Sequence, residues 1–435
     1  MIYLPQILFL IALLAAGFLF WRRIRVIHAL ILLGQPTLPN DQPAQRWKNL
    51  FLLALGQKKM FKNVPVAIMH LIIYAGFIII NLEVAEIVLD GVTGHHRLFL
   101  PLLGSWYPIF INTFEVLALG VLLVCVIFLI RRNITRVNRL VHGDLKGWPA
   151  SDANYILFAE IVLMSLFLTM NAADQWLQTT GNSHYPPTGN FLVSQWILPL
   201  LSGGTEHSWW LLERACWWLH ILGIFAFLNY LPHSKHLHIL LAFPNAYYAP
   251  LQTPGTFINM ASVQQEVLFA MQPELAPANS TPPEHFGAKD IPQLSQKSLL
   301  DAFSCTECGR CTAACPANLT GKKLSPRKIM MATRDRMEEM GKQLTVAGEW
   351  KPDGKTLLHD YISVEELRAC TTCMACVEEC PVSISPLSII TELRRSLIME
   401  ESNAPQEWNS SFSNIENNFA PWKFAPDSRD AWTQD

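Results

Sequence analysis

Five long apolar segments most strongly constrain what this chain can fold into. They cover roughly residues 1–21, 65–89, 107–130, 154–178 and 208–231. About 20 helical residues cross a hydrocarbon core about 30 Å thick, so each segment is long enough to span a membrane. The first segment has no basic stretch before it and no small-residue cleavage site after it, so we expect a retained span and not a signal peptide. The sequence therefore predicts five transmembrane helices.

The loops between these segments differ in basic residues, and the difference predicts an orientation. Residues 22–64 and 131–151 are rich in Lys and Arg, whereas 90–106 contains only Arg97 and 179–207 contains neither. Short basic loops stay on the cytoplasmic side of a membrane. We therefore expect the N-terminus outside and the C-terminal part in the cytoplasm of a bacterial or archaeal cell, where thiols stay reduced.

The composition changes from apolar to polar near residue 243. A chain of 435 residues exceeds the usual size of one domain. We expect a membrane domain, a linker, a cysteine-containing domain and a tail, covering 1–243, 244–297, 298–400 and 401–435. The net charge of -2 gives no electrostatic case for a nucleic-acid partner.

Two copies of the pattern C-x2-C-x2-C-x3-C-P follow residue 300. In this pattern three closely spaced thiolates hold one [4Fe-4S] cluster, and the fourth cysteine reaches the other cluster. Zinc is a weaker alternative, because structural zinc sites favour paired C-x2-C hooks without a trailing proline. We predict two clusters, the first held by Cys305, Cys308, Cys311 and Cys380 and the second by Cys370, Cys373, Cys376 and Cys315.

Helices are expected around both motifs. Residues 326–344 have a helical pattern, and Pro326 suits a first helical turn. Ser363 followed by Glu366 is a capping box that predicts a second helix start.

Three histidines are candidate ligands of haem b. His220 and His238 are 18 residues apart, which is five turns of a continuous helix and about 27 Å. His70 stands at a similar predicted depth to His238 on the second span, and facing imidazoles hold b-type haem in helical bundles. His233 and His236 fall about 140° and 160° away from His220, so we expect them to be interfacial.

The membrane segment resembles the cytochrome b subunit of respiratory nitrate reductase and the membrane subunit of heterodisulfide reductase, most closely over WWLHILGIFAFLNYLPHSKHLHI. The resemblance implies a haem between His70 and His238. The family's fourth ligand position is Ile80 here, so His220 is left with a second haem, a quinone or simple packing as alternatives. Four acidic residues in or near the spans are not assigned to a site: Glu83, Glu86, Glu115 and Glu160.

Residues 298–398 resemble the iron-sulfur subunit of heterodisulfide reductase and its relatives. These enzymes also use a cysteine-rich CCG domain, and this sequence has no Cys-Cys pair. We therefore expect the chain to relay electrons to a separate soluble CCG-type subunit or a flavoprotein. The linker and tail have a disorder-like composition, but Trp408, Trp422 and Trp432 make the tail the expected docking surface.

The expected architecture is mostly α: a five-helix transmembrane haem b bundle followed by a cytoplasmic helical domain with two [4Fe-4S] clusters. The expected function is that of an electron-transfer subunit of an oxidoreductase linked to the quinone pool, with one haem or two. No nucleotide-binding motif is found in the sequence. The alternatives are a membrane-bound ferredoxin for assembly or maturation, and a haem-free anchor.

Overall fold

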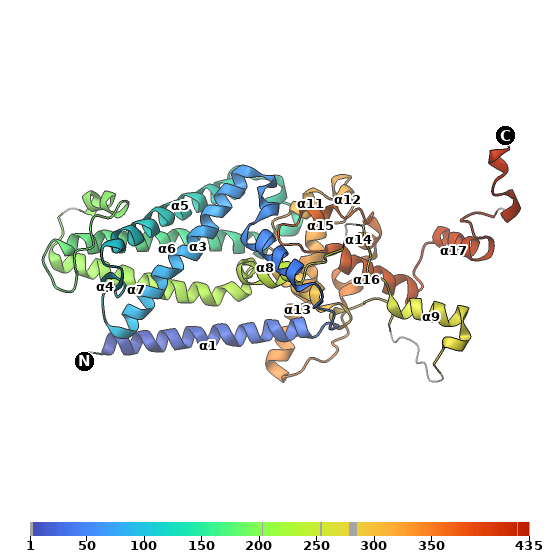
Figure 1. The fold of residues 1–435 in the computed structure, drawn as a ribbon, viewed down its shortest axis with the longest axis horizontal. Coiled ribbons are helices and arrows are strands. Elements are labelled where there is room, and N and C mark those ends of the chain that lie inside the picture. Colours follow the sequence, from blue (N-terminus) through green and yellow to red (C-terminus); the bar gives the residue numbers. More distant parts are fainter. Residues whose placement is uncertain (1–2, 202, 253–254, 278–284, 424, 435) are drawn as a thin grey trace.

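The computed structural model describes residues 3–201, 203–252, 255–277, 285–423 and 425–434. Over these residues the chain is mostly helical, and its only β contacts are two isolated bridges. A long helical bundle carries a globular helical domain at one end, and the C-terminal helix projects beyond that domain (Figure 1).

Five helices are long and apolar enough to cross a membrane, which confirms the number predicted from the sequence. They pack in the order α1, α3, α5, α6 and α7, and α7 returns to contact α1. Their bounds are α1 Leu4–Leu32, α3 Val64–Thr93, α5 Tyr107–Asn133, α6 Trp148–Gln178 and α7 Glu206–Tyr230.

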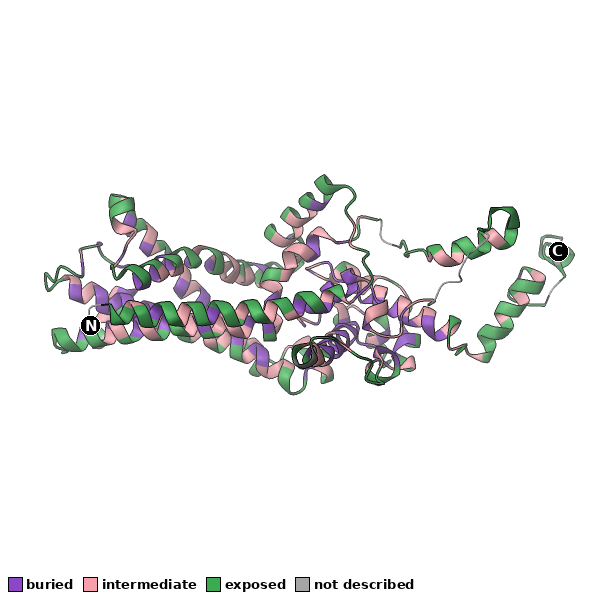
Figure 2. Cartoon of the chain, turned by 90° about the horizontal axis from the view of Figure 1, so that it is seen from below, coloured by how far each residue is buried: buried purple, intermediate pink, exposed green. Residues whose placement is uncertain are grey.

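The outer surface of the bundle is apolar. Exposed residues run along α1 and over the outer faces of the other long helices (Figure 2). On α1 the exposed side chains include Ile7, Ile11 and Leu14, each more than half exposed. Apolar side chains on this scale are stable only where water does not reach them, so this surface suits a lipid environment.

The helix that carries His220 does not continue to His238. It ends at Tyr230, and two short 3-10 turns, Leu231–His233 and Lys235–Leu237, follow on either side of an extended Ser234. The next helix, α8 (His238–Tyr247), begins at His238 itself. The prediction of one continuous helix from His220 to His238 is therefore wrong, because the backbone is extended at Ser234. The directions of the two side chains cannot be related by counting 100° per residue.

The globular domain surrounds the two cysteine motifs with helices, as expected. Ser325 caps α13 and Pro326 occupies its first turn, while Ser363 and Glu366 form the capping box at the start of α14. The sequence predicted both helix starts. The main helices are α10 Gln296–Ser304, α11 Arg310–Ala313, α13 Pro326–Ala347, α14 Val364–Ala369, α15 Ala375–Glu379 and α16 Pro386–Met399.

The core of this domain includes residues on both sides of residue 298. Ala288, Ile291 and Leu294 are fully buried in the same apolar cluster as Leu299 and Leu393. Part of the segment expected to be a linker is thus packed against the cluster-binding domain.

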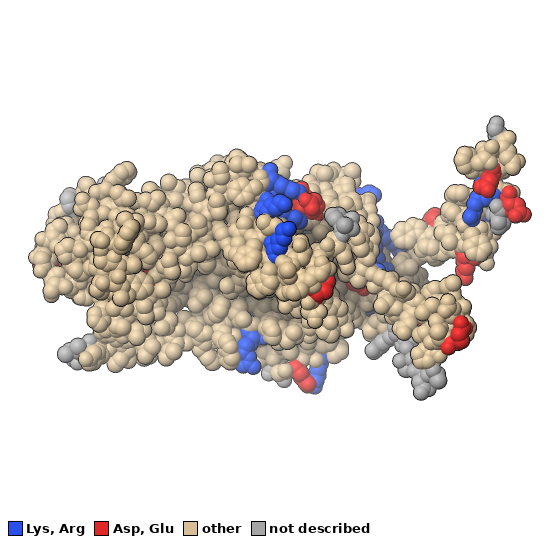
Figure 3. All heavy atoms as spheres, in the orientation of Figure 1, with Lys and Arg blue, Asp and Glu red and all other residues tan. Residues whose placement is uncertain are grey.

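Several polar contacts fasten the domain to the bundle. Charged side chains gather where the two parts meet, whereas the far end of the bundle is nearly free of them on the visible face (Figure 3). Arg23 of α1 pairs with Glu338 of α13, and Lys62 pairs with Glu378 at 3.1 Å. Beyond α1, an added Cβ at Gly34 would lie 2.7 Å from the Leu294 carbonyl oxygen, so only glycine permits this approach.

Candidate functional site

Cysteines from both motifs line a first hollow. Its walls include Cys305, Cys308 and Cys311 of the first motif and Cys376 and Cys380 of the second. A contact between α11 and α15 brings the two motifs together. We call this site the first hollow.

The second hollow has the complementary set of cysteines. Cys370, Cys373 and Cys376 line it together with Cys315, which ends the first motif. Cys376 lines both hollows, and the other seven cysteines divide between the hollows as the spacing predicts. The assignment of four ligands to each cluster stays a prediction. Cys373 in the second hollow is exposed, whereas the other seven motif cysteines are buried or partly buried.

Each motif loop makes two left-handed turns that direct its backbone around the hollow. Glu307 and Gly309 have φ of 54° and 74°, and Thr372 and Met374, at the equivalent positions, have φ of 56° and 61°. The Thr372 N–H donates to Cys370 Sγ at 3.4 Å. The Glu307 N–H bonds Cys305 in the same way. Such N–H···S bonds tune the potential of a bound cluster.

Most of these thiols are too buried to ionise alone. Burial raises the pKa of Cys305 to about 11 and the pKa values of Cys376 and Cys380 to about 12. A coordinated metal ion supplies the positive charge that removes such protons. Four thiols around each hollow therefore fit a [4Fe-4S] cluster. Among the described residues, no three His, Cys, Asp or Glu side chains converge closely enough to hold a single metal ion.

Three histidines, His70, His236 and His238, lie near one another where the bundle joins the globular domain. Burial, together with the nearby His238 and His70 rings, lowers the pKa of His236 to about 3, and burial also lowers the pKa of His238. The sequence analysis discounted His236, because the turn at Ser234 that brings it beside His238 is invisible to helical periodicity. Both imidazoles are neutral at pH 7, which is the form that binds iron.

Each predicted ligand holds one ring nitrogen in a hydrogen bond. His70 Nδ1 donates to Gln57 Oε1 at 3.0 Å, and His238 Nδ1 donates to the Lys235 carbonyl at 3.0 Å. In this tautomer the proton is on Nδ1, and Nε2 is the free acceptor. Metal-binding histidines have the same arrangement. On the next turn of α3 the buried Tyr74 hydroxyl has no partner among the described residues.

His220 lies deeper in the bundle and has the same tautomer. Its Nδ1 donates to the Leu163 carbonyl at 3.0 Å, and the Phe167 ring lies 6.0 Å away. The ring is buried, and its Nε2 has no protein partner in the part of the chain that is described. Ile80, at the position of the missing family ligand, is also buried. His70 and His238 interact electrostatically, whereas no ring contact joins His220 to another histidine among the described residues.

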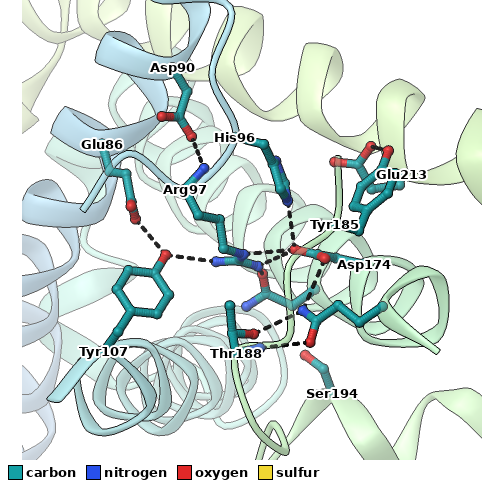
Figure 4. A network of polar contacts seen from close by, with 12 residues as sticks. Glu86, Asp90, His96, Arg97, Tyr107, Asp174, Tyr185, Thr188, Ser194 and Glu213 are labelled. Carbon is teal, nitrogen blue, oxygen red and sulfur yellow. Dashed lines mark hydrogen bonds and ion pairs between the residues drawn. The ribbon is translucent and has the colours of Figure 1, made fainter. Parts of the chain in front are cut away.

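A polar network closes the opposite end of the bundle (Figure 4). Arg97 is almost completely buried and donates to Asp174 at 2.8 Å and to Asn171 at 3.1 Å. Its backbone N–H donates to Asp90, and Tyr107 donates to Glu86 at 2.8 Å. From the sequence, Arg97 is only a charged residue in a loop. Its partners come from three separate helices and a loop, so no local pattern connects them with Arg97.

Comparison with known proteins supports the iron-sulfur assignment. Residues 304–384 match the family of 4Fe-4S dicluster domains, so this part of the chain is an iron-sulfur domain. The whole chain is similar to a probable iron-sulfur-binding oxidoreductase FadF of Bacillus subtilis, with 27% identity over 98% of this chain and 60% of that protein. It is similar to an EtfAB:quinone oxidoreductase of Syntrophomonas wolfei, with 26% identity over 95% of this chain and 57% of that protein.

The cluster domain also has a relative among the heterodisulfide reductases. One subunit of the ferredoxin/F(420)H(2)-dependent CoB-CoM heterodisulfide reductase from Methanosarcina acetivorans is 31% identical over 27% of this chain and 60% of that protein. No solved structure matches the chain. The chain spans about 60% of the length of the curated relatives that it matches along its whole length.

Proposed function

We propose that this chain is a membrane electron-transfer subunit of a quinone-linked oxidoreductase, relaying electrons between a soluble partner, two [4Fe-4S] clusters, haem b and membrane quinone. The observation that carries the proposal is the position of the first hollow against the membrane domain. Arg139, from the loop after α5, donates to the Cys308 carbonyl at 2.7 Å, and Arg310 donates to the Lys59 carbonyl at 3.2 Å.

The arrangement implies an order of redox sites. The second hollow is lined by Cys373, the motif cysteine that is exposed and therefore accessible to a soluble partner. The first hollow lies against the loops of the bundle, close to the turn that carries His236 and His238. We therefore assign the outer position to the cluster in the second hollow and the inner position to the cluster in the first.

The chain's own residues hold and orient these groups. We assign His70 and His238 as the residues that would hold a haem b, with Gln57 and the Lys235 carbonyl orienting their rings. When bound, the haem and the clusters are one-electron carriers. His220 is assigned to a second haem or to the quinone, because a buried ring nitrogen without a partner is costly unless a ligand meets it.

Sidedness follows from the basic loops. Arg23, Lys59 and Lys62 lie at the end of the bundle that contacts the globular domain. The positive-inside rule then puts this domain in the cytoplasm.

The tail is assigned to partner docking. Its helix α17 (Gln406–Asn418) presents Trp408, Phe412 and Ile415 at helical spacing, each between 43% and 50% exposed. An apolar stripe of this kind on a projecting helix fits a groove of a soluble CCG-type or flavin-containing partner. A chain ending at residue 400 should lose the partner in a pull-down, and a truncated chain that keeps the partner would refute this assignment.

An optical spectrum tests the membrane half of the proposal. The purified protein should show a b-type α band after reduction with dithionite, and His70→Ala and His238→Ala should each abolish that haem. His207→Ala is the matched control. His207 stacks on Trp210 at the start of α7, the end of the helix far from His238, so this substitution should leave the band intact. A wild-type spectrum without the band would leave the haem-free alternatives, an anchor or an assembly ferredoxin.

A further inference from the structure

A buried ion pair connects the first hollow to the turn that holds His238. Glu307 stands between Cys305 and Cys308, and its carboxylate accepts from Lys235 Nζ at 2.5 Å. The two side chains are 2% and 11% exposed. Arg334 of α13 also pairs with Glu307. The Glu307 carboxylate thus lies between two basic side chains.

Every polar group of Lys235 is engaged at this junction. Its backbone N–H donates to Asp152 at 3.1 Å, and its Nζ donates to the Pro149 carbonyl at 2.6 Å. Its carbonyl accepts from His238 Nδ1 at 3.0 Å. One residue therefore binds the cluster loop through its side chain and orients the histidine ring through its backbone.

The second motif offers an internal comparison. Thr372 occupies the position equivalent to Glu307, with nearly the same left-handed φ and the same N–H bond to the first cysteine of its motif. Backbone geometry at this position thus requires no carboxylate. At this position only the first motif has an acidic residue, and its buried charge is tolerated because Lys235 and Arg334 neutralise it.

We propose that Glu307 and Lys235 are positioning residues that couple the inner cluster electrostatically and mechanically to the His238 haem site. This inference rests on the proposed function, since it assigns a role to the contact between two of its redox sites. Lys235 stabilises the extra negative charge of a reduced cluster, whereas Glu307 opposes that charge and anchors Lys235. The pair thereby sets the cluster potential and fixes the approach of the loop to the His238 turn.

A redox titration monitored by EPR tests the coupling. Lys235→Met should lower the midpoint potential of the inner cluster by at least about 59 mV. This shift corresponds to a tenfold change in the equilibrium constant for one-electron reduction. Glu307→Gln should raise it, and the double variant should deviate from the sum of the two shifts, as expected for interacting residues. Lys235→Arg, which keeps the charge, should restore most of the wild-type potential.

Two controls separate this role from simple docking. Arg23→Met removes another ion pair between the bundle and the globular domain, but Arg23 contacts neither cysteine motif, so both potentials should stay unchanged. Thr372→Val should leave the inner cluster unaffected. If Lys235→Met does not accumulate, Glu307→Gln and Lys235→Arg carry the same test. Limited proteolysis checks that the domain stays docked in each variant.

The outcomes discriminate between the inference and the proposed function. If the wild-type protein contains haem and both clusters, but the potentials of the variants are unchanged or strictly additive, the inference is overturned and the proposed function is not. A wild-type protein without a haem band would refute the haem assignment, while the opposite shifts of the inner cluster would still measure the Glu307–Lys235 pair. Equal shifts in Arg23→Met would reduce the pair to a docking contact and refute the inference.

Discussion

At the scale of single residues, the exchange of the fourth cysteine between motifs is the feature that joins the two hollows. Cys380 reaches the first hollow and Cys315 reaches the second, so neither motif provides a complete set of four thiols alone. Because each set spans both motifs, binding of the clusters and folding of the domain are expected to be linked.

Substituting a crossing cysteine should therefore affect the cluster of the other motif. Cys380→Ser should remove or convert the inner cluster and lower the EPR spin count of the reduced protein from about two clusters to about one per chain. Cys125→Ser is the control, since this thiol is buried in α5 away from both hollows. Loss of the outer cluster with retention of the inner one would contradict the ligand assignment.

At the scale of elements, the two ends of the bundle are fixed by different interactions. The end near the globular domain depends on ion pairs such as Arg23 with Glu338, whereas the other end depends on the buried network around Arg97. A buried ion pair is costly to break, since its remaining partner keeps an unpaired charge away from water. The network therefore holds the loops after α3 and α6 onto the helix ends.

The Arg97 network should contribute measurably to stability. Arg97→Leu leaves the buried Asp174 carboxylate without its arginine partner, and we expect the free energy of unfolding to fall by about 3–5 kcal/mol, seen as a lower Tm in detergent. Lys323→Met is the comparison, because its pair with Glu365 is exposed, with side chains 70% and 62% accessible. That pair should contribute less than about 1 kcal/mol. Equal effects of the two substitutions would refute a structural role for the network.

At the scale of the whole molecule, the sequence predicts local features better than long-range ones. The five apolar helices, the start of α13 and the capping box at Ser363 follow from patterns a few residues apart, and the structure has them. The turn at Ser234 follows Pro232, and the Ser234 side chain caps it by accepting from the His236 N–H, but helical periodicity does not show where the turn places the two histidines. The same holds for Arg23 and Glu338, which are 315 positions apart.

This difference also applies to the candidate sites. Motif spacing is sufficient to group the eight cysteines, because the fourth-ligand exchange is inherent in the pattern. The Lys235–Glu307 pair and the place of His236 depend on how the globular domain sits on the bundle, which no local pattern encodes.

The central claim is that the clusters and the membrane haem act in series. The most direct test starts from purified protein in which dithionite has reduced both the clusters and the haem. The reductant is removed, and the protein is mixed with a water-soluble quinone analogue. Samples frozen rapidly after mixing then report the oxidation of the clusters by EPR. The wild-type clusters should reoxidise together with the haem band, and His238→Ala, which lacks that haem, should reoxidise its clusters much more slowly. Equal rates of cluster reoxidation in the two proteins would contradict the claim.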